Sequence, residues 1–218
     1  MFDGLQPTGL DATVYHMASI KGPTVEKLAM LGVSVDNFRE VIEELRKIGE
    51  ALSADDIVSN TFRPSEGYLT PFNPSRFTDG HYGVLYTALE TETSIAEIEY
   101  HQRKAGYFHH LENDESAPKR YFDILKLDFS GSHFDLFPIA DEVPELTSEE
   151  DSGYPRCRKI AQEAIDAAAD ALLTPSARAE ERKCLPMFSA SSFEGDAKIV
   201  GSGYFLHYEG QIIFRNQE

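Results

Sequence analysis

Residues 75–101, SRFTDGHYGVLYTALETETSIAEIEYH, decide the type of fold, because they hold one element of each kind close together. The run GVLYTA at 83–88 is short and apolar, which predicts a buried strand. Residues 91–104 predict a helix that ends near Gly106. An arginine precedes the strand, a tyrosine lies inside it, and a glutamate falls in the first turns of the helix.

The rest of the chain extends this pattern on both sides. Apolar residues spaced by three and four between 35 and 52 predict an amphipathic helix with Ser34 as its N-cap. A further helix is predicted from Pro155. Strands are predicted at 12–17, 121–129, 185–188, 199–207 and 211–214, and loops at 59–79 and in the acidic stretch 141–151. The sum is an α+β (mixed α/β) domain, with mostly antiparallel strands flanked by helices.

Composition restricts the class of protein. With 218 residues, 41% of them hydrophobic, the chain can bury the core of one large domain or of one domain with an extension. No apolar run approaches the roughly 20 residues that span a bilayer, and the start lacks the features of a secretory signal. We therefore expect a cytoplasmic protein that does not bind membranes.

Charge and cysteine content exclude further classes. A net charge of −17 repels the nucleic-acid backbone, so direct DNA or RNA binding is not expected. Cys157 and Cys184 are the only cysteines, which favours two reduced thiols over a disulfide framework or a CxxC metal site. His109-His110 has no third ligand at a useful spacing, and Gly201-Ser-Gly203 lacks the strand–GxGxxG–helix context of a dinucleotide fingerprint. We expect no metal and no Rossmann site.

Three residues of the opening stretch, taken singly, have ordinary explanations. Arg76 fits a surface ion pair, and Tyr86 fits a core residue with a bonded hydroxyl. Ser94-Ile-Ala-Glu97 spells a capping box, in which Glu97 would bond a backbone N–H at the start of the helix.

Their joint spacing, together with a second motif, resembles the RES domain family, which includes the toxins of RES–Xre toxin–antitoxin pairs. In this resemblance the arginine is Arg76, the tyrosine ten residues on is Tyr86, and the glutamate eleven further is Glu97. The second motif is a Tyr-Pro helix that leads to a Leu-Leu-x-Pro-Ser-x-Arg turn, here Tyr154-Pro155 and residues 172–178, with Ser176 as the serine. The resemblance covers roughly residues 76–188. The charged run at 179–183 departs from the small residues that often follow the serine.

The resemblance implies an ADP-ribosyltransferase-like fold that binds NAD⁺ as its substrate and cleaves the nicotinamide–ribose bond, by hydrolysis or phosphorolysis. It also implies restraint by a cognate Xre-type helix-turn-helix antitoxin, and a homodimer is compatible with it. Two alternatives stay open: an ADP-ribosyltransferase that modifies a protein, and an inactive NAD-binding regulatory module. Residues 1–65 are expected to form a helical extension that packs on a catalytic domain at 66–218.

The chemistry of this cleavage matches the residue types. A carboxylate stabilises the oxocarbenium-like ribose, which is the role expected for Glu97. Arg76 suits the pyrophosphate, since a guanidinium binds oxygens bidentately. Tyr86 can stack on a ring or bond the substrate, and Ser176 can bond a carboxamide or a ribose hydroxyl. These four are the expected catalytic residues.

Two neighbours are expected to assist in binding. Arg178 is placed to contact phosphate, with a salt bridge to nearby acids as the equal alternative. His101 lies four residues after Glu97 and hence on the same side of the helix, where it can orient Glu97 or a water. An ordinary surface histidine fits His101 equally well.

Overall fold

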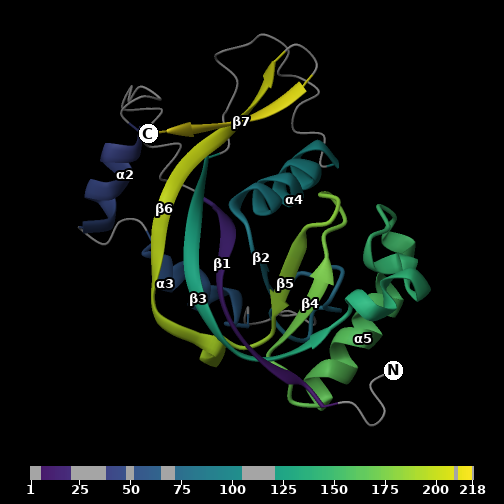
Figure 1. Ribbon diagram of the computed structural model, residues 1–218. Helices are drawn as coiled ribbons and strands as arrows, with labels where there is room; N and C mark the ends of the chain where they lie inside the picture. The colour runs from purple at the N-terminus through teal and green to yellow at the C-terminus, as the bar shows by residue number, and fades with distance from the viewer. Residues whose placement is uncertain are drawn as a thin grey trace.

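The computed structural model describes residues 6–20, 38–47, 52–64, 72–104, 121–208 and 211–217 (Figure 1). Its strands are β1 (Thr8–Ser19), β2 (Leu85–Ala88), β3 (Tyr121–Asp135), β4 (Ala171–Pro175), β5 (Lys183–Met187), β6 (Phe193–Tyr208) and β7 (Gln211–Gln217). Its α-helices are α2 (Phe38–Lys47), α3 (Ala54–Thr61), α4 (Thr91–Lys104) and α5 (Tyr154–Asp166), and its short 3-10 helices are η2 (Phe137–Glu142), η3 (Pro144–Leu146), η4 (Asp151–Gly153) and η5 (Ala190–Ser192).

The strands form one sheet that closes on itself. Their order is β1-β2-β5-β4-β3-β6-β7, and β1 also pairs with β3, so that β1, β2, β5, β4 and β3 make a ring. All pairings are antiparallel except that between β3 and β4. The predicted α+β class, with mostly antiparallel strands and flanking helices, is confirmed.

Strand β3 is the central strand of the sheet, because it pairs with β1, β4 and β6. Its first part pairs with β6 and its last three residues pair with β4, while β1 runs along its other edge from Thr8↔His133 to Ser19↔Phe122. Two irregularities in its pairing with β6 fall after Ile124 and after Lys126. Such irregularities bend a strand, and Figure 1 shows β1, β3 and β6 as long curved strands side by side.

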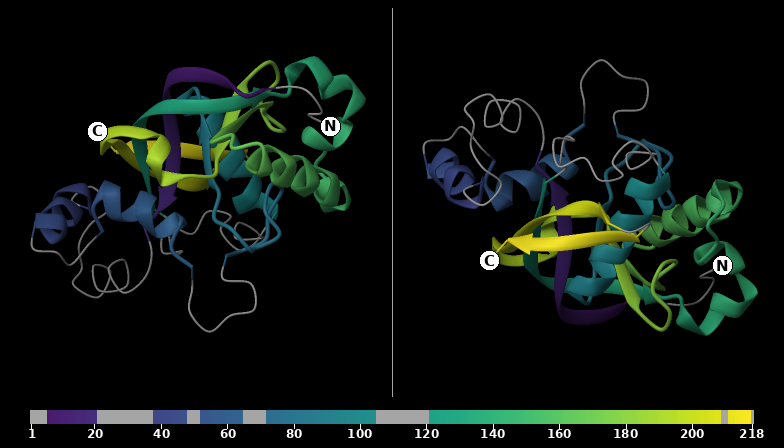
Figure 2. Two further views of the ribbon diagram at one scale, coloured as in Figure 1. Left: turned by 90° about the horizontal axis from the view of Figure 1, so that it is seen from below. Right: turned by 90° about the horizontal axis from the view of Figure 1, so that it is seen from above.

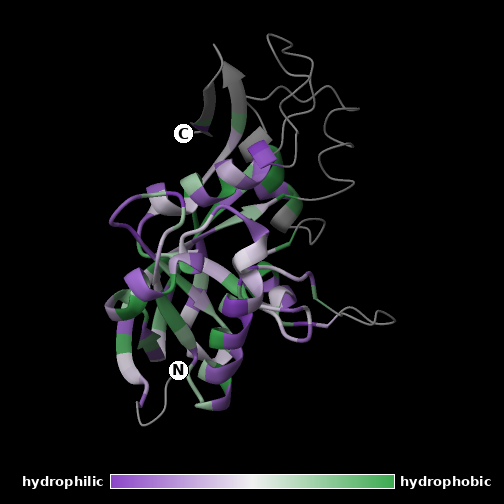
Figure 3. Ribbon diagram, turned by 90° about the vertical axis from the view of Figure 1, so that its right-hand side faces the viewer, coloured by the Kyte–Doolittle hydropathy of each residue, from purple (hydrophilic) through white to green (hydrophobic). Residues whose placement is uncertain are grey.

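The ring encloses the main core. Val14, Leu85, Leu125, Leu185 and Met187, one or two from most of its strands, are each completely buried. Figure 3 shows hydrophobic residues, in green, concentrated on the strands at the centre of the fold, with hydrophilic residues on the loops around them. This interior fixes the register of the strands, because a shift by one residue would turn every buried side chain outward.

Helices cover the sheet from several sides (Figures 1 and 2). The apolar side of α4, Ile95 and Ile98, packs on a cluster that includes Met17 and Phe122. Helix α5 contributes its buried residues, among them Ile160, to a second cluster at the end of β3 and β4. Helix α2 packs on the sheet through Ile42, and α3 adds Ala54 and Val58 to the main core.

Most predicted elements are present, and several strands are longer than predicted, for example β3, which extends to Asp135 instead of residue 129. Helix α4 has the predicted range 91–104, and strands lie at all six predicted places. The predicted helix 35–52 is α2, and its proposed N-cap Ser34 lies outside the described residues, as do His109-His110 and Gly106. The Leu-Leu-Thr-Pro part of the second motif is strand β4, so the turn starts only at Ser176.

Two predictions of loop structure are wrong. Residues 59–61 belong to α3, which a capping box between Ser53 and Asp56 starts: the Ser53 hydroxyl accepts from Asp56 N, and the Ser53 N–H donates to the Asp56 carboxylate. The acidic stretch 141–151 contains parts of η2, η3 and η4, and its backbone carbonyls accept side-chain hydrogen bonds instead of facing only water.

The segment predicted as an amino-terminal extension, residues 1–65, contributes a strand as well as helices. Strand β1 pairs with both β2 and β3 and thereby closes the ring. Strands from both sides of the predicted boundary at residue 65 therefore belong to the same sheet. The division into two units stays a prediction. In the described part of the chain, no helix is long and apolar enough to cross a membrane.

Candidate active site

Glu97 and Ser176, which are far apart in the sequence, are in direct contact in the fold. The Ser176 hydroxyl donates to Oε1 of Glu97 over 2.6 Å. Glu97 lies in the second turn of α4, and Ser176 directly follows β4, where it is only 7% exposed. A buried hydroxyl that bonds a carboxylate at this distance is a strong, charge-assisted contact.

The turn after β4 holds the Ser176 side chain in place. The same hydroxyl oxygen accepts from the backbone N–H groups of Arg178 and Ala179, at 3.1 and 3.0 Å, and the Ser176 N–H donates to the Arg182 carbonyl. An oxygen that accepts twice has its own proton left for Glu97. The turn therefore sets the direction of the hydrogen bond to the carboxylate.

The capping box that the sequence suggested for Ser94 and Glu97 is absent. Helix α4 begins at Thr91, so Ser94 lies inside it, and the Ser94 hydroxyl donates to the Tyr15 carbonyl of β1 over 2.8 Å. The Glu97 carboxylate bonds Ser176 and not the backbone N–H of Ser94, which donates to Glu90. Glu97 is thus free of a structural duty at the helix start.

Tyr86 presents its ring while its hydroxyl is enclosed. The residue is 38% exposed, yet the hydroxyl lies 2.6 Å from Ser75 Oγ and accepts from the Phe77 N–H over 3.0 Å. Burial of this hydroxyl raises the pKa of Tyr86 to about 12, against the two hydrogen bonds and the charge of Arg76. The phenol therefore stays neutral, and the exposed ring remains as a face for stacking.

Arg76 is engaged mainly with the backbone. Its guanidinium donates to the carbonyls of Glu145, Leu146 and Ser148 at 2.7, 2.8 and 2.6 Å, and it lies 5.1 Å from the centre of the Tyr154 ring. Of the five N–H groups of an arginine, at most two are left for a ligand. Its charge nevertheless acts on Tyr86 and Cys184, which places it in the same neighbourhood.

Arg178, by contrast, is a buried cation with few partners. Its side chain is 4% exposed and its guanidinium carbon lies 3.3 Å from the centre of the Tyr100 ring. It donates to the Ala177 carbonyl over 3.1 Å, and its carboxylate partner, Glu149, is 3.7 Å away and 73% exposed. Among the described residues, no acceptor meets its Nε. The predicted salt bridge of Arg178 is therefore present, while its contact with phosphate stays a prediction.

His101 follows one turn after Glu97 but does not bond it in the described part of the structure. Its ring contacts that of Tyr100 edge to face. Partial burial lowers the pKa of His101, and the charge of Glu97 acts in the opposite direction. Its orienting role stays a prediction.

Two residues near the site belong to neither sequence motif. The Arg178 guanidinium stacks on the Tyr100 ring, and the Tyr100 hydroxyl donates to the Glu149 carbonyl over 2.9 Å. It lies three residues after Glu97, and this helical spacing is a signal that could have found it. Cys184, on β5, lies 3.7 Å from Glu97 Oε1, and no local pattern points to it.

A family model of the RES domain matches residues 44–207. The chain belongs to the RES domain family. It is also similar to a chain in the crystal structure of the M. tuberculosis MbcT–MbcA toxin–antitoxin complex, with a TM-score of 0.49 and 11% sequence identity over 94% of this chain and 90% of that chain. No curated protein matches the sequence significantly.

The RES match contains every candidate residue, from Arg76 to Ser176 and Arg178. Strand β1, which closes the ring, precedes the matched region. Cys157 and Cys184 both fall within it. Both are free thiols, as the sequence predicted.

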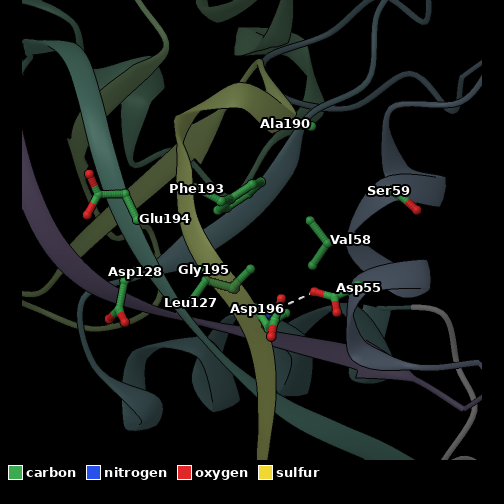
Figure 4. Close-up of a pocket in the computed structure, with 11 residues that line it drawn as sticks. Asp55, Val58, Ser59, Leu127, Asp128, Ala190, Phe193, Glu194, Gly195 and Asp196 are labelled. Atoms are coloured by element: carbon green, nitrogen blue, oxygen red, sulfur yellow. Dashed lines mark hydrogen bonds between the residues drawn. The ribbon is translucent and has the colours of Figure 1, made fainter.

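One hollow in the RES domain lies away from these residues. It has a volume of about 200 Å³ and is bordered by α3, β3 and β6. Figure 4 shows Val58 and Phe193 on its apolar side. The Ala197 N–H donates to the Asp55 carboxylate over 2.8 Å. None of the candidate residues lines it, and no group of three metal-binding side chains occurs in the described part of the chain. The candidate active site is therefore the hydrogen-bonded group around Glu97 and not this hollow.

Proposed function

We propose that this RES domain cleaves the nicotinamide–ribose bond of NAD⁺. The observation that carries the proposal is the Glu97–Ser176 pair. A carboxylate on a helix is held through one oxygen by a buried hydroxyl, 2.6 Å away, that the turn after β4 fixes in direction. A fixed carboxylate suits a reaction in which positive charge develops at a known position.

The reaction needs that carboxylate at the ribose. As the glycosidic C–N bond breaks, its electron pair leaves with nicotinamide, which departs neutral, and positive charge spreads over the ribose carbon and ring oxygen. A negative charge beside this centre lowers the barrier, as carboxylates do in glycoside cleavage. Water or phosphate then adds to the ribose carbon, and when water adds its surplus proton is released to solvent. Glu97 is the group that we assign to the ribose.

The other residues take binding roles in this proposal. The exposed ring of Tyr86 offers a stacking face, because its hydroxyl is already bonded to Ser75 and Phe77. Arg178 is assigned to the pyrophosphate, since a buried guanidinium with an orphaned Nε is completed by an anion. Arg76, with three N–H groups on carbonyls, then serves mainly to hold residues 145–148.

We further propose that the chain acts as the toxin of a toxin–antitoxin pair. Support comes from membership in the RES family and from the net charge of −17, which attracts a basic DNA-binding antitoxin of the Xre type. Unrestrained NAD⁺ cleavage would harm the host cell, so an inhibitor is required. Mixing the purified chain with the product of the neighbouring gene should give a complex and inhibition. Neither would be seen if the toxin role is wrong.

Release of nicotinamide from NAD⁺ tests the activity directly. The wild-type chain, with and without phosphate, is compared with Glu97→Gln, which keeps the shape of the side chain and removes its charge. We expect the variant to lose at least a hundredfold in rate, since the charge acts on the transition state. No release by the wild type under any condition would refute the proposal, and equal rates would refute the assignment of Glu97.

The fate of the ADP-ribose identifies the acceptor. With labelled NAD⁺ and a cell lysate, free ADP-ribose or its phosphate indicates hydrolysis or phosphorolysis. Label on a discrete protein indicates a transferase. An inactive regulatory module would bind NAD⁺ and release nothing.

A further inference from the structure

Cys184 lies where it can hold the carboxylate of Glu97 together with Ser176. Its Sγ is 3.7 Å from Oε1 of Glu97, the same oxygen that accepts from the Ser176 hydroxyl. Among the described residues, no donor reaches the other oxygen, Oε2. One edge of the carboxylate is thus bonded by the protein, and the other edge is left for a ligand.

The sheet fixes the position of this thiol. Cys184 is a residue of β5, and it pairs with Ala88 of β2 on one side and with Thr174 of β4 on the other. A residue between two strands of a closed ring has little freedom to move. Glu97, by contrast, has three rotatable side-chain bonds and lies on a helix, so contacts from the sheet are what hold it still.

The thiol keeps the proton that it needs to donate. Burial raises the pKa of Cys184 far above the ordinary value, and the negative charge of Glu97 raises it further. At neutral pH the side chain is therefore a neutral S–H group. Such a group is a weak donor, but a carboxylate is a strong acceptor.

We propose that Cys184 is a positioning residue for Glu97: its S–H and the Ser176 O–H both donate to Oε1, which fixes the plane of the carboxylate and leaves Oε2 for the substrate. The role in catalysis rests on the proposed NAD⁺ cleavage, whereas the hydrogen bond itself does not. The two can be tested separately.

Infrared spectroscopy tests the hydrogen bond without any activity. Cys157→Ala leaves Cys184 as the only thiol of the chain, so that a single S–H stretching band remains. We expect this band at the lower frequency of a hydrogen-bonded thiol, and we expect it to rise when Glu97→Ala is added. A band that Glu97→Ala leaves unmoved would overturn the proposal, whether or not the chain cleaves NAD⁺.

Kinetics test the positioning role. Cys184→Ala is expected to lower kcat roughly three- to tenfold with KM within about twofold, since a weak bond to a charged group acts on the transition state. Cys184→Ser restores an O–H donor and should recover part of the loss, while Cys184→Val fills the space without a donor and should not. The buried Cys157→Ala, which leaves Glu97 untouched, is the matched control and should keep the wild-type kcat.

Equal kcat for the wild type, Cys184→Ala and Cys184→Val would overturn the positioning role. If the wild type releases no nicotinamide at all, the proposed function fails, and the infrared result still decides whether the thiol bonds Glu97. A valine variant as active as the serine variant would show that only packing at this position matters, which also overturns the proposal.

Discussion

Replacing Arg76 with alanine is expected to destabilise the fold by about 3 kcal/mol, in addition to any effect on the reaction. Arg76 is a residue that family resemblance assigns to the substrate, yet its visible contacts are with the protein. Its guanidinium joins the stretch before β2 to the carbonyls of Glu145, Leu146 and Ser148. An inactive Arg76→Ala variant would therefore be ambiguous unless its stability is known.

The magnitude follows from three charge-assisted hydrogen bonds in a partly buried setting. A hydrogen bond to a charged group contributes about 1.5–3 kcal/mol when fully buried. Here the carbonyls regain water when Arg76 is removed, so about 1 kcal/mol for each bond is the appropriate value. Loss of the contact with the Tyr154 ring, 5.1 Å away, adds a smaller amount.

Urea unfolding, followed by circular dichroism, measures this loss. For a chain of this size a slope of about 3 kcal/mol/M is reasonable, so the midpoint should fall by about 1 M. Arg103→Ala is the control, because Arg103 is 64% exposed and its ion pair in the described part of the chain is with Glu99, one turn away on α4. A pair of this type contributes less than about 0.5 kcal/mol. If Arg76→Ala unfolds at the same midpoint as Arg103→Ala, the three hydrogen bonds of Arg76 do not stabilise the protein.

Other perturbations give equally direct outcomes. Arg178→Met keeps an apolar contact with Tyr100 but removes the charge, so KM for NAD⁺ should rise roughly tenfold or more with little change in kcat; an unchanged KM would remove Arg178 from the pyrophosphate site. Gly83→Ala would place a Cβ only 2.2 Å from the Thr61 carbonyl oxygen, and overpacking of this kind should lower Tm by roughly 5–10 °C in thermal unfolding; a Tm equal to that of the wild type would show that α3 yields easily. Burial raises the pKa of Tyr86 to about 12, from 10.0 in an unfolded chain, so the folded state keeps a proton that the unfolded state loses. The stability that the protonated Tyr86 hydroxyl contributes is therefore complete below pH 10 and is lost as the pH rises to about 12. Tyr86→Phe should make the free energy of unfolding fall less steeply over this range. An identical pH dependence of the two proteins would contradict the burial of the hydroxyl.

The sequence predicts the elements of this fold better than their connections. Helix 91–104 has its predicted bounds, because its pattern and its ends are local properties. Helix α3 is missed, since its eight residues are too few to show a period and Pro64 follows closely. The closure of the ring by β1 is not predictable from periodicity, because it depends on residues of β3 more than 100 positions away.

The candidate site shows the same division. Glu97 and Ser176 could be paired from the sequence only through family resemblance, since 79 positions separate them. The capping-box reading of Glu97 followed a sound local rule, but the helix starts three residues before Ser94 and the rule does not apply there. The contacts of Arg76, Arg178 and Cys184 depend on how the turns and strands meet in space.

The pairing of β1 with β3 also leaves β1 without its longest partner strand early in synthesis. Residues 8–19 leave the ribosome before the other described strands, and their partners in β3 follow 103–125 positions later. At ordinary rates of translation β1 waits roughly 5–25 s before it can pair with β3. During that interval Val14 and Met17, which the finished protein buries, are exposed to other chains. The nascent chain is therefore most prone to aggregate, and most in need of a chaperone, before the residues of the candidate site at Ser176 have been made.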